Sequence, residues 1–270
     1  NLTVNIRSSM LPSYSDCPRR AAAKAFPYLI TPAGFQLRQL PPSIGASIGT
    51  GCHKGSIKLV DDIINQGTPG DLNDAIDMSI FDFHERISDG VIWDSTTVNQ
   101  NDAEHQIRIL VGSFLREVAP KLKPTHTERP HRANIDTGFQ LTGHTDIESI
   151  DQSIDDLKYG ARMRPYFQQL GGYSLLKKTA DKTQPPVLRL YHLPRVSLKK
   201  SYPGASVHEY DVTECEQSAW WTLKHIISHV KKFQATGEPW CFPANPMSMM
   251  CSDKYCPAWG TEFCKMGCKK

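Results

Sequence analysis

The sequence contains no long apolar run, no internal repeat and no low-complexity tract. A helix that crosses a bilayer needs about 20 consecutive apolar residues, and no stretch approaches that length. The opening residues, NLTVNIRSSM, do not show the charged-then-apolar pattern of a secretory signal. These absences predict a cytoplasmic protein with no membrane partner.

The sequence also has little excess of charge of either sign. Its 31 Lys and Arg residues nearly balance 28 Asp and Glu residues, which leaves a formal net charge of +3. This charge is compatible with a polyanionic partner but does not require one. The 270 residues, 39% of them hydrophobic, are enough to bury a substantial core in one large domain or two small ones.

Cysteine is sparse through most of the chain and then concentrated at its end. The terminal cysteines are Cys241, Cys251, Cys256, Cys264 and Cys268. A secreted disulfide scaffold is typically short and carries cysteines throughout, so this array indicates metal or iron–sulfur ligation instead. Cys52 and Cys215 fall on predicted helices and are interpreted as ordinary buried thiols, while Cys241 has no assigned role.

Hydrophobic periodicity predicts that the first half of the chain is mainly helical. Ser13 or Ser15 is expected to cap an Ala-rich helix, because a hydroxyl can accept a bond from a free helix N–H. Further helices are predicted over 47–64, 74–87 and 103–118. Residues 119–132 are interpreted as a basic, Pro-containing linker.

The second half has a mixed pattern. Segments 139–151 and 153–160 alternate like paired strands joined by a turn at 151–153. The later elements are expected to be a helix over 166–178, strands within 187–196 and 207–212, and a helix over 213–234 that Gly237 ends. This order predicts an α/β fold with a small mixed central β-sheet flanked by helices.

Three charged side chains are predicted to converge on the paired strands. Asp146 lies near the middle of one strand, and Asp156 and Lys158 share a face of its neighbour because side chains repeat every second residue. Carboxylates held together repel unless a cation lies between them, and oxygen ligands suit Mg²⁺ or Mn²⁺. A lysine there could orient or deprotonate the attacking water and offset phosphate charge, which indicates phosphodiester hydrolysis. An isolated D-x-K tripeptide is more often a solvated surface pair.

Other polar residues could complete such a site. His53, on a predicted helix, could supply an imidazole nitrogen to a metal, although a lone histidine is more often an ordinary surface or core residue. Gln169 and Tyr173 lie one helical turn apart and could hydrogen-bond a phosphate or a water. Neither pattern is specific without the others.

Taken together and in this order, these residues resemble the RecB-type branch of the PD-(D/E)XK nuclease superfamily. The matching motifs are CPRR from Cys17, Gly49 to His53, Gly143 to Asp146, Asp156 to Lys158, Gln169 to Tyr173, and the cysteines from Cys251 onward. The resemblance spans nearly the whole chain. It implies a restriction-endonuclease-like core in a single domain, 1–270. Its expected parts are a mainly helical part, 1–125, a catalytic core, 133–235, and a Cys-rich tail, 238–270, that packs with the Cys17 segment.

The resemblance implies a metal-dependent deoxyribonuclease, an exonuclease that processes DNA ends in recombination, repair or phage replication. His53, Asp146, Asp156 and the backbone carbonyl of Leu157 would then hold Mg²⁺ or Mn²⁺. Lys158 would be the catalytic lysine, with Gln169 and Tyr173 supporting the site. Two alternatives are a non-catalytic nucleic-acid-binding module with the same fold and an RNA-directed nuclease.

The resemblance also implies a [4Fe-4S] cluster in the iron–sulfur exonuclease branch, held by Cys17, Cys251, Cys256 and Cys264, with Cys268 as an alternate ligand. Four thiolates equally suit a structural Zn²⁺ ion, and reduced cysteines without a metal are a further alternative. Such a site would join the two ends of the chain.

The expected partner is DNA, single-stranded or at its ends, with a possible recombination partner protein. Basic side chains hold a phosphate backbone without reading its sequence. The candidates are Arg19, Arg20, Arg162, Arg164, Lys199 and Lys200. Each of them could instead be an ordinary solvated charge. Tyr166 or Trp259 could stack on unpaired bases or belong to the core.

Overall fold

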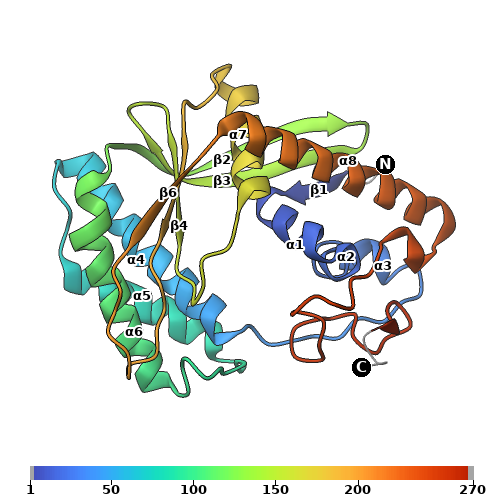
Figure 1. The fold of residues 1–270 in the computed structure, drawn as a ribbon, viewed down its shortest axis with the longest axis horizontal. Coiled ribbons are helices and arrows are strands. Elements are labelled where there is room, and N and C mark those ends of the chain that lie inside the picture. Colours follow the sequence, from blue (N-terminus) through green and yellow to red (C-terminus); the bar gives the residue numbers. More distant parts are fainter. Residues whose placement is uncertain (1–2, 267–270) are drawn as a thin grey trace.

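A computed structural model describes residues 3–266 as an α/β fold, in which helices flank one mixed sheet (Figure 1). Its strands are β1 (Val4–Arg7), β2 (Pro124–Asp136), β3 (Phe139–Ser149), β4 (Ile154–Lys158), β5 (Leu188–His192) and β6 (Ser206–Tyr210). Its α-helices are α1 (Leu11–Asp16), α2 (Pro18–Ala25), α3 (Pro27–Ile30), α4 (Ile44–Gln66), α5 (Leu72–Ile87), α6 (Gln100–Ser113), α7 (Phe167–Asp181) and α8 (Val212–Thr236). Short 3₁₀ or π turns are η1 (Ser8–Met10), η2 (Phe114–Val118), η3 (Ala119–Lys121) and η4 (Pro239–Cys241). The predicted fold class is confirmed.

Strand β3 is the centre of the sheet. The order is β1-β3-β4-β5-β6, and β2 pairs antiparallel with β3. β1 runs parallel to the first part of β3, whereas β4 runs antiparallel to its last part, where Ile147 lies opposite Asp155. β4 and β5 are parallel, and β6 returns antiparallel. β2 therefore covers one edge of β3, and β1 and β4 share the other edge.

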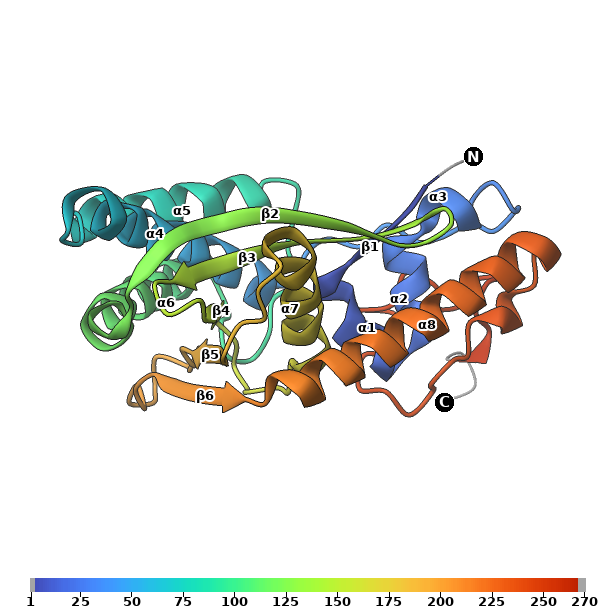
Figure 2. The ribbon, with the colours of Figure 1, turned by 90° about the horizontal axis from the view of Figure 1, so that it is seen from above.

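Helices pack on both sides of this sheet (Figure 2). Helices α4, α5 and α6 form a core with Ile147, Leu157 and Tyr191 of the sheet. On the opposite side, α7 and the start of α8 pack on Ile154 and Leu188. Because Ile154 and Leu157 differ by an odd number of positions, they point to opposite faces of β4. Asp156 and Lys158 therefore share the α7 face with Ile154.

The predicted linker over 119–132 is wrong. β2 begins at Pro124 and runs along β3 to Asp136. Proline is a poor residue for a central strand because it has no N–H to donate, but β2 pairs with β3 alone, so Pro124 and Pro130 are tolerated at this edge. Strand β1 was not predicted at all.

The predicted cap at Ser13 or Ser15 is also wrong. Both serines lie inside α1, and α2 begins after Cys17 with Pro18 in its first turn, where no N–H is needed. The later long helix is confirmed, since α8 ends at Gly237 in the left-handed conformation with φ of 70°. Within the predicted strand 187–196, only β5 is regular.

The segment after α8 folds back onto the N-terminal helices (Figure 1). Phe242 and Phe263 pack with Phe35 and Phe233 in one aromatic cluster. The backbone N–H of Arg19 donates to the carbonyl of Pro243 at 3.1 Å. The two ends of the described chain therefore share a hydrophobic core. Across residues 3–266, none of the helices combines the length and the apolar character that crossing a membrane demands.

Candidate active site

The two aspartates of the paired strands lie close together on the α7 face of the sheet. The backbone N–H of Leu157 donates to Asp146 Oδ2 at 2.8 Å, so this carboxylate from β3 lies against β4. Lys158 Nζ lies 2.5 Å from Asp156 Oδ2. Asp156 is fully buried, and its Oδ2 accepts no hydrogen bond of ordinary geometry from the described residues. The lysine ammonium is thus the contact that compensates this buried carboxylate.

Helix α4 brings His53 to the same place. His53 Nδ1 lies 3.7 Å from Asp146 Oδ2, and Nε2 lies 3.3 Å from Glu128 Oε1 of β2. Gly49 allows this approach because a Cβ there would lie 3.2 Å from the carbonyl oxygen of Tyr159, which is tighter than usual. Gly49 therefore lets α4 approach the sheet closely, and His53, one turn later, makes the polar contacts of this approach.

Helix α7 covers Asp156 with Gln169 and Tyr173. Gln169 Nε2 donates to the Tyr173 hydroxyl at 2.8 Å and to Asp156 Oδ1 at 3.5 Å. A Cβ on Gly143 of β3 would lie 3.0 Å from Tyr173 Cε1, so a glycine at this position lets the tyrosine ring lie against the strand. The Gln169 amide therefore contacts one oxygen of Asp156, and the Tyr173 phenol accepts a bond from the same amide.

These residues border a cavity of about 760 Å³. Its lining includes His53, Asp146, Leu157, Lys158 and Tyr173, whereas Asp156 and Gln169 lie behind it. The other polar side chains that line it are Arg7, Ser9, Thr50, Thr142, His144 and Tyr159. A polar group of a substrate could therefore reach the imidazole, one carboxylate and the ammonium from one space.

Burial and charge shift the pKa values of these groups in opposite ways. Burial raises the pKa of Asp156, and the charge of Lys158 offsets only part of this effect. Burial by itself lowers the pKa of Lys158, but the neighbouring Asp156 and Asp146 outweigh it and the pKa lies above its usual value. For His53, the charges of Asp146 and Glu128 likewise outweigh burial and raise its pKa. The site therefore has a strong preference for positive charge.

The donor set suits a hard divalent cation in its chemistry. Two carboxylates, one imidazole and a backbone carbonyl are donors that Mg²⁺ and Mn²⁺ accept. Within residues 3–266, however, no three His, Cys, Asp or Glu side chains are gathered closely enough to hold an ion as they stand. Lys158 instead contacts one of these donors, because its ammonium lies against Asp156 Oδ2, the buried oxygen with no ordinary hydrogen bond.

The sequence reasoning missed Glu128. It lies in the segment interpreted as a linker, and its backbone has a φ of 44°, unusual for a residue other than glycine. A carboxylate on one ring nitrogen of a histidine fixes the tautomer, so that the other nitrogen is free to bind a cation. Glu128 therefore positions His53 with Nδ1 toward Asp146. Only the recognition of β2 as a strand beside β3 could have indicated that Glu128 lies next to His53.

Four of the predicted cysteine ligands border a much smaller cavity. Cys17, Cys251, Cys256 and Cys264 all line a space of about 10 Å³, whereas Cys268 lies outside the described residues. Burial raises the pKa of Cys256, and the nearby Cys264 and Cys17 raise it further. Four cysteines from both ends of the chain therefore border one space, although within residues 3–266 no three of them lie closely enough to hold an ion as they stand. The space is about that of one water molecule.

The other cysteines have ordinary surroundings. Cys52 and Cys215 are fully buried, as predicted, and burial raises the pKa of both thiols, that of Cys215 to about 12. Cys241 is half-buried, and its sulfur lies 3.4 Å from the Thr236 hydroxyl.

The prediction that Arg19 and Arg20 contact DNA requires correction. Arg19 is 2% exposed, donates through Nε to the Phe242 carbonyl at 2.9 Å and lies over the Trp240 ring. Arg20 is 6% exposed and pairs with Asp16 at 3.1 Å. Arg19 thus joins the two ends of the chain and Arg20 pairs locally, and both arginines are buried, so their guanidinium groups do not face a backbone phosphate.

The other predicted contacts lie at or near the surface. Arg162 and Arg164 are exposed in the loop between β4 and α7, and Lys199 and Lys200 are exposed after β5. Tyr166 is half-buried, with Lys158 Nζ 5.0 Å from its ring centroid, and Trp259 packs against the core that joins the chain ends. The loop arginines thus follow directly after the strand that carries Lys158.

Comparisons with known proteins find one kind of similarity. No protein-family model matches the chain, and no curated protein matches it either. Among solved structures, a crystal structure from Eubacterium rectale named "Putative exonuclease" is similar, with a TM-score of 0.54 and 12% sequence identity over 86% of this chain and 82% of that chain. At this identity the similarity is one of fold. The chain thus shares its α/β arrangement of a mixed sheet flanked by helices with a protein that bears an exonuclease name.

Proposed function

We propose that this protein is a metal-dependent deoxyribonuclease, an exonuclease of the RecB-type PD-(D/E)XK superfamily that processes DNA ends in recombination, repair or phage replication. The observation that supports it most is the convergence of His53, Asp146, Asp156 and Lys158 from α4, β3 and β4 at one cavity. Exonuclease activity is further suggested by the name of the protein that shares the fold.

His53, Asp146, Asp156 and the Leu157 carbonyl would hold Mg²⁺ or Mn²⁺, which polarises a phosphate and lowers the pKa of a bound water. The Lys158 ammonium contacts Asp156 and lines the cavity, where it would offset the charge of a bound phosphate. Gln169 and Tyr173 keep Asp156 oriented throughout. Glu128 keeps His53 oriented.

Purified protein incubated with end-labelled DNA is expected to release mononucleotides or short oligonucleotides with Mg²⁺ or Mn²⁺ and nothing with a chelator. Single-stranded DNA, duplex DNA and RNA are compared under the same conditions, and the products are resolved on denaturing gels. Preferential RNA cleavage would favour an RNA-directed nuclease. Nucleic-acid binding without cleavage under any metal would favour a non-catalytic binding module.

The four cysteines that meet at the small cavity would hold a [4Fe-4S] cluster or a structural Zn²⁺ ion. The donors are right for both, and the ends of the chain already share a core around them. A metal held there would stabilise the terminal segment, since binding to a folded site adds to the free energy of unfolding.

Anaerobically purified protein is expected to carry metal bound by these cysteines, and Cys256→Ser is expected to lose it and to melt at a lower temperature. Metal analysis together with the absorbance spectrum distinguishes the two forms, because an iron–sulfur cluster absorbs broadly in the visible range and zinc does not. Cys215→Ser, a buried thiol away from the site, is the control and is expected to keep the metal. Wild-type protein that contains neither iron nor zinc would contradict this proposal.

A further inference from the structure

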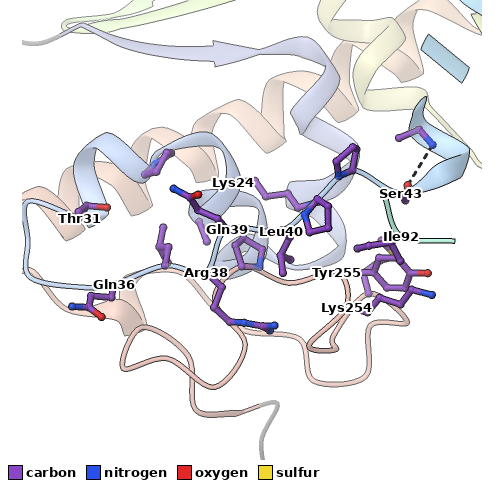
Figure 3. Close-up of a pocket in the computed structure, with 18 residues that line it drawn as sticks. Lys24, Thr31, Gln36, Arg38, Gln39, Leu40, Ser43, Ile92, Lys254 and Tyr255 are labelled. Carbon is purple, nitrogen blue, oxygen red and sulfur yellow. Dashed lines mark hydrogen bonds between the residues drawn. The ribbon is translucent and has the colours of Figure 1, made fainter. Parts of the chain in front are cut away.

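A second cavity, of about 770 Å³, lies between α2, the segment 36–43 and the C-terminal segment (Figure 3). Three cations line it: Lys24 from α2, Arg38 from the segment that leads to α4, and Lys254 from the segment after α8. We call this space the cationic groove. No carboxylate side chain of the described residues is among those that line it.

The three cations have no charged partner within residues 3–266. Arg38 Nη1 donates to the backbone carbonyl of Asp253 at 2.8 Å, and Lys254 Nζ donates to that of Trp93 at 2.9 Å. Burial lowers the pKa of Lys24, the nearby Arg20 lowers it further, and Cys256 opposes this shift. Uncompensated positive charge of this kind favours an anionic ligand.

The groove also has apolar walls beside polar side chains, which include Thr31, Gln36 and Gln39. Leu40, Pro41, Pro42 and Ile92 line it, and Tyr255 presents its ring beside Lys254 (Figure 3). Consecutive prolines restrict the backbone, so this wall is formed before a ligand arrives. Apolar and aromatic surface next to separated cations suits a ligand with flat rings and repeated phosphates. A duplex keeps its base faces stacked inside, whereas a single strand exposes them.

The groove adjoins the active-site cavity. Ala46, in the first turn of α4, lines both spaces, and Ser43 caps this helix beside them. The amino end of a helix carries partial positive charge, which favours phosphates at the junction. A polymer that lies in the groove can therefore continue past α4 to His53.

We propose that the cationic groove binds a single strand of DNA and leads it across the start of α4 to the active site. The inference rests on the proposed nuclease function for the identity of the strand. It adds a binding site: Lys24, Arg38 and Lys254 hold the backbone phosphates, and Tyr255 stacks on a base.

The test measures binding without cleavage, by fluorescence anisotropy of labelled oligothymidylate in buffer with a chelator. The triple variant Lys24→Gln, Arg38→Gln, Lys254→Gln is expected to bind at least about tenfold more weakly. The slope of log affinity against log salt is expected to shrink by about 2, since each phosphate contact contributes about 0.7 on single strands. Tyr255→Ala is expected to weaken binding by about tenfold through lost stacking.

The matched control is Lys178→Gln, Lys182→Gln, Lys232→Gln, which removes the same charge from exposed lysines outside the groove. It is expected to bind oligothymidylate almost as wild type does. Equal weakening in both triple variants, with Tyr255→Ala unchanged, would overturn the inference. So would competition by polyglutamate as strong as that by oligothymidylate, which would assign the groove to an acidic protein segment.

These outcomes are separate from those that test the nuclease. Metal-dependent cleavage by wild-type protein, with no binding defect in the groove variants, would support the proposed function and contradict the groove as a binding site. Groove-dependent binding by a wild-type protein that cleaves nothing would support the groove as a binding site and contradict the proposed nuclease function. Circular dichroism of each variant checks that the fold is retained.

Discussion

Replacing Asp156 or Lys158 with alanine is expected to abolish cleavage per folded molecule while leaving DNA binding largely intact; Lys158→Ala is also expected to lower stability, because it leaves the buried Asp156 carboxylate without its ammonium partner. Asp156 is the fully buried carboxylate and Lys158 the cation that lines the cavity beside it. Loss of one group that stabilises developing charge typically slows a reaction by about 10²- to 10³-fold, and loss of a metal ligand is expected to cost at least as much. The readouts are initial cleavage rate with Mg²⁺ and, separately, DNA binding in chelator.

The neighbouring Asp155 provides the control on the same strand. It is also buried, but it points to the other face of β4 and pairs with Ser149 and Arg189. Asp155→Asn is expected to lower stability and to keep the cleavage rate per folded molecule. Unchanged turnover in Asp156→Ala or Lys158→Ala would refute the site, because the proposed chemistry has no substitute for either group.

The second large effect is expected at a buried ion cluster between α7 and β3. Glu148 accepts from Lys177 Nζ at 2.6 Å and from Arg129 at 3.1 Å, and its other oxygen lies 2.8 Å from His131 Nε2. Lys177 is 4% exposed and also pairs with Asp181. Lys177→Met removes one partner and leaves the buried carboxylate undercompensated, so it is expected to lower the free energy of unfolding by about 3 kcal/mol.

Urea denaturation followed by fluorescence measures this loss. The matched control is Lys178→Met, one position along the helix, where the lysine side chain is 50% exposed and its partner Glu216 also accepts from the Ser174 hydroxyl at 2.7 Å. A pair whose cation is exposed and whose carboxylate keeps another donor contributes about 0 to 1 kcal/mol. Equal destabilisation by both substitutions would show that Glu148 does not depend on Lys177.

Local patterns in the sequence were sufficient for the long helices, for β3 and β4, and for part of the site. The alternation of residues 139–160 and the turn between them predicted β3 and β4, and thereby the shared face of Asp156 and Lys158. The helices α4, α5, α7 and α8 were predicted because their apolar residues repeat with the helical period. Each of these inferences depends on neighbours within a few residues.

The misjudged elements all depend on distant contacts. β2 was taken for a linker because its prolines argue against a strand, and pairing along one edge of β3 is what accommodates them. Glu128 was missed for the same reason. Arg19 and Arg20 were expected at the surface because arginine is usually exposed, yet the returning C-terminal segment buries them.

The order of amino acids alone thus specified the long helices and the β3–β4 pair and which side each of them turns inward, because side-chain direction repeats with a short local period. The tertiary structure determined which residues share a space. Helix α4 meets β3 at His53, and β2 brings Glu128 to the same histidine. The two chain ends enclose four cysteines and border the groove. These tertiary contacts join residues up to about 250 positions apart, and no local periodicity of the sequence encodes them.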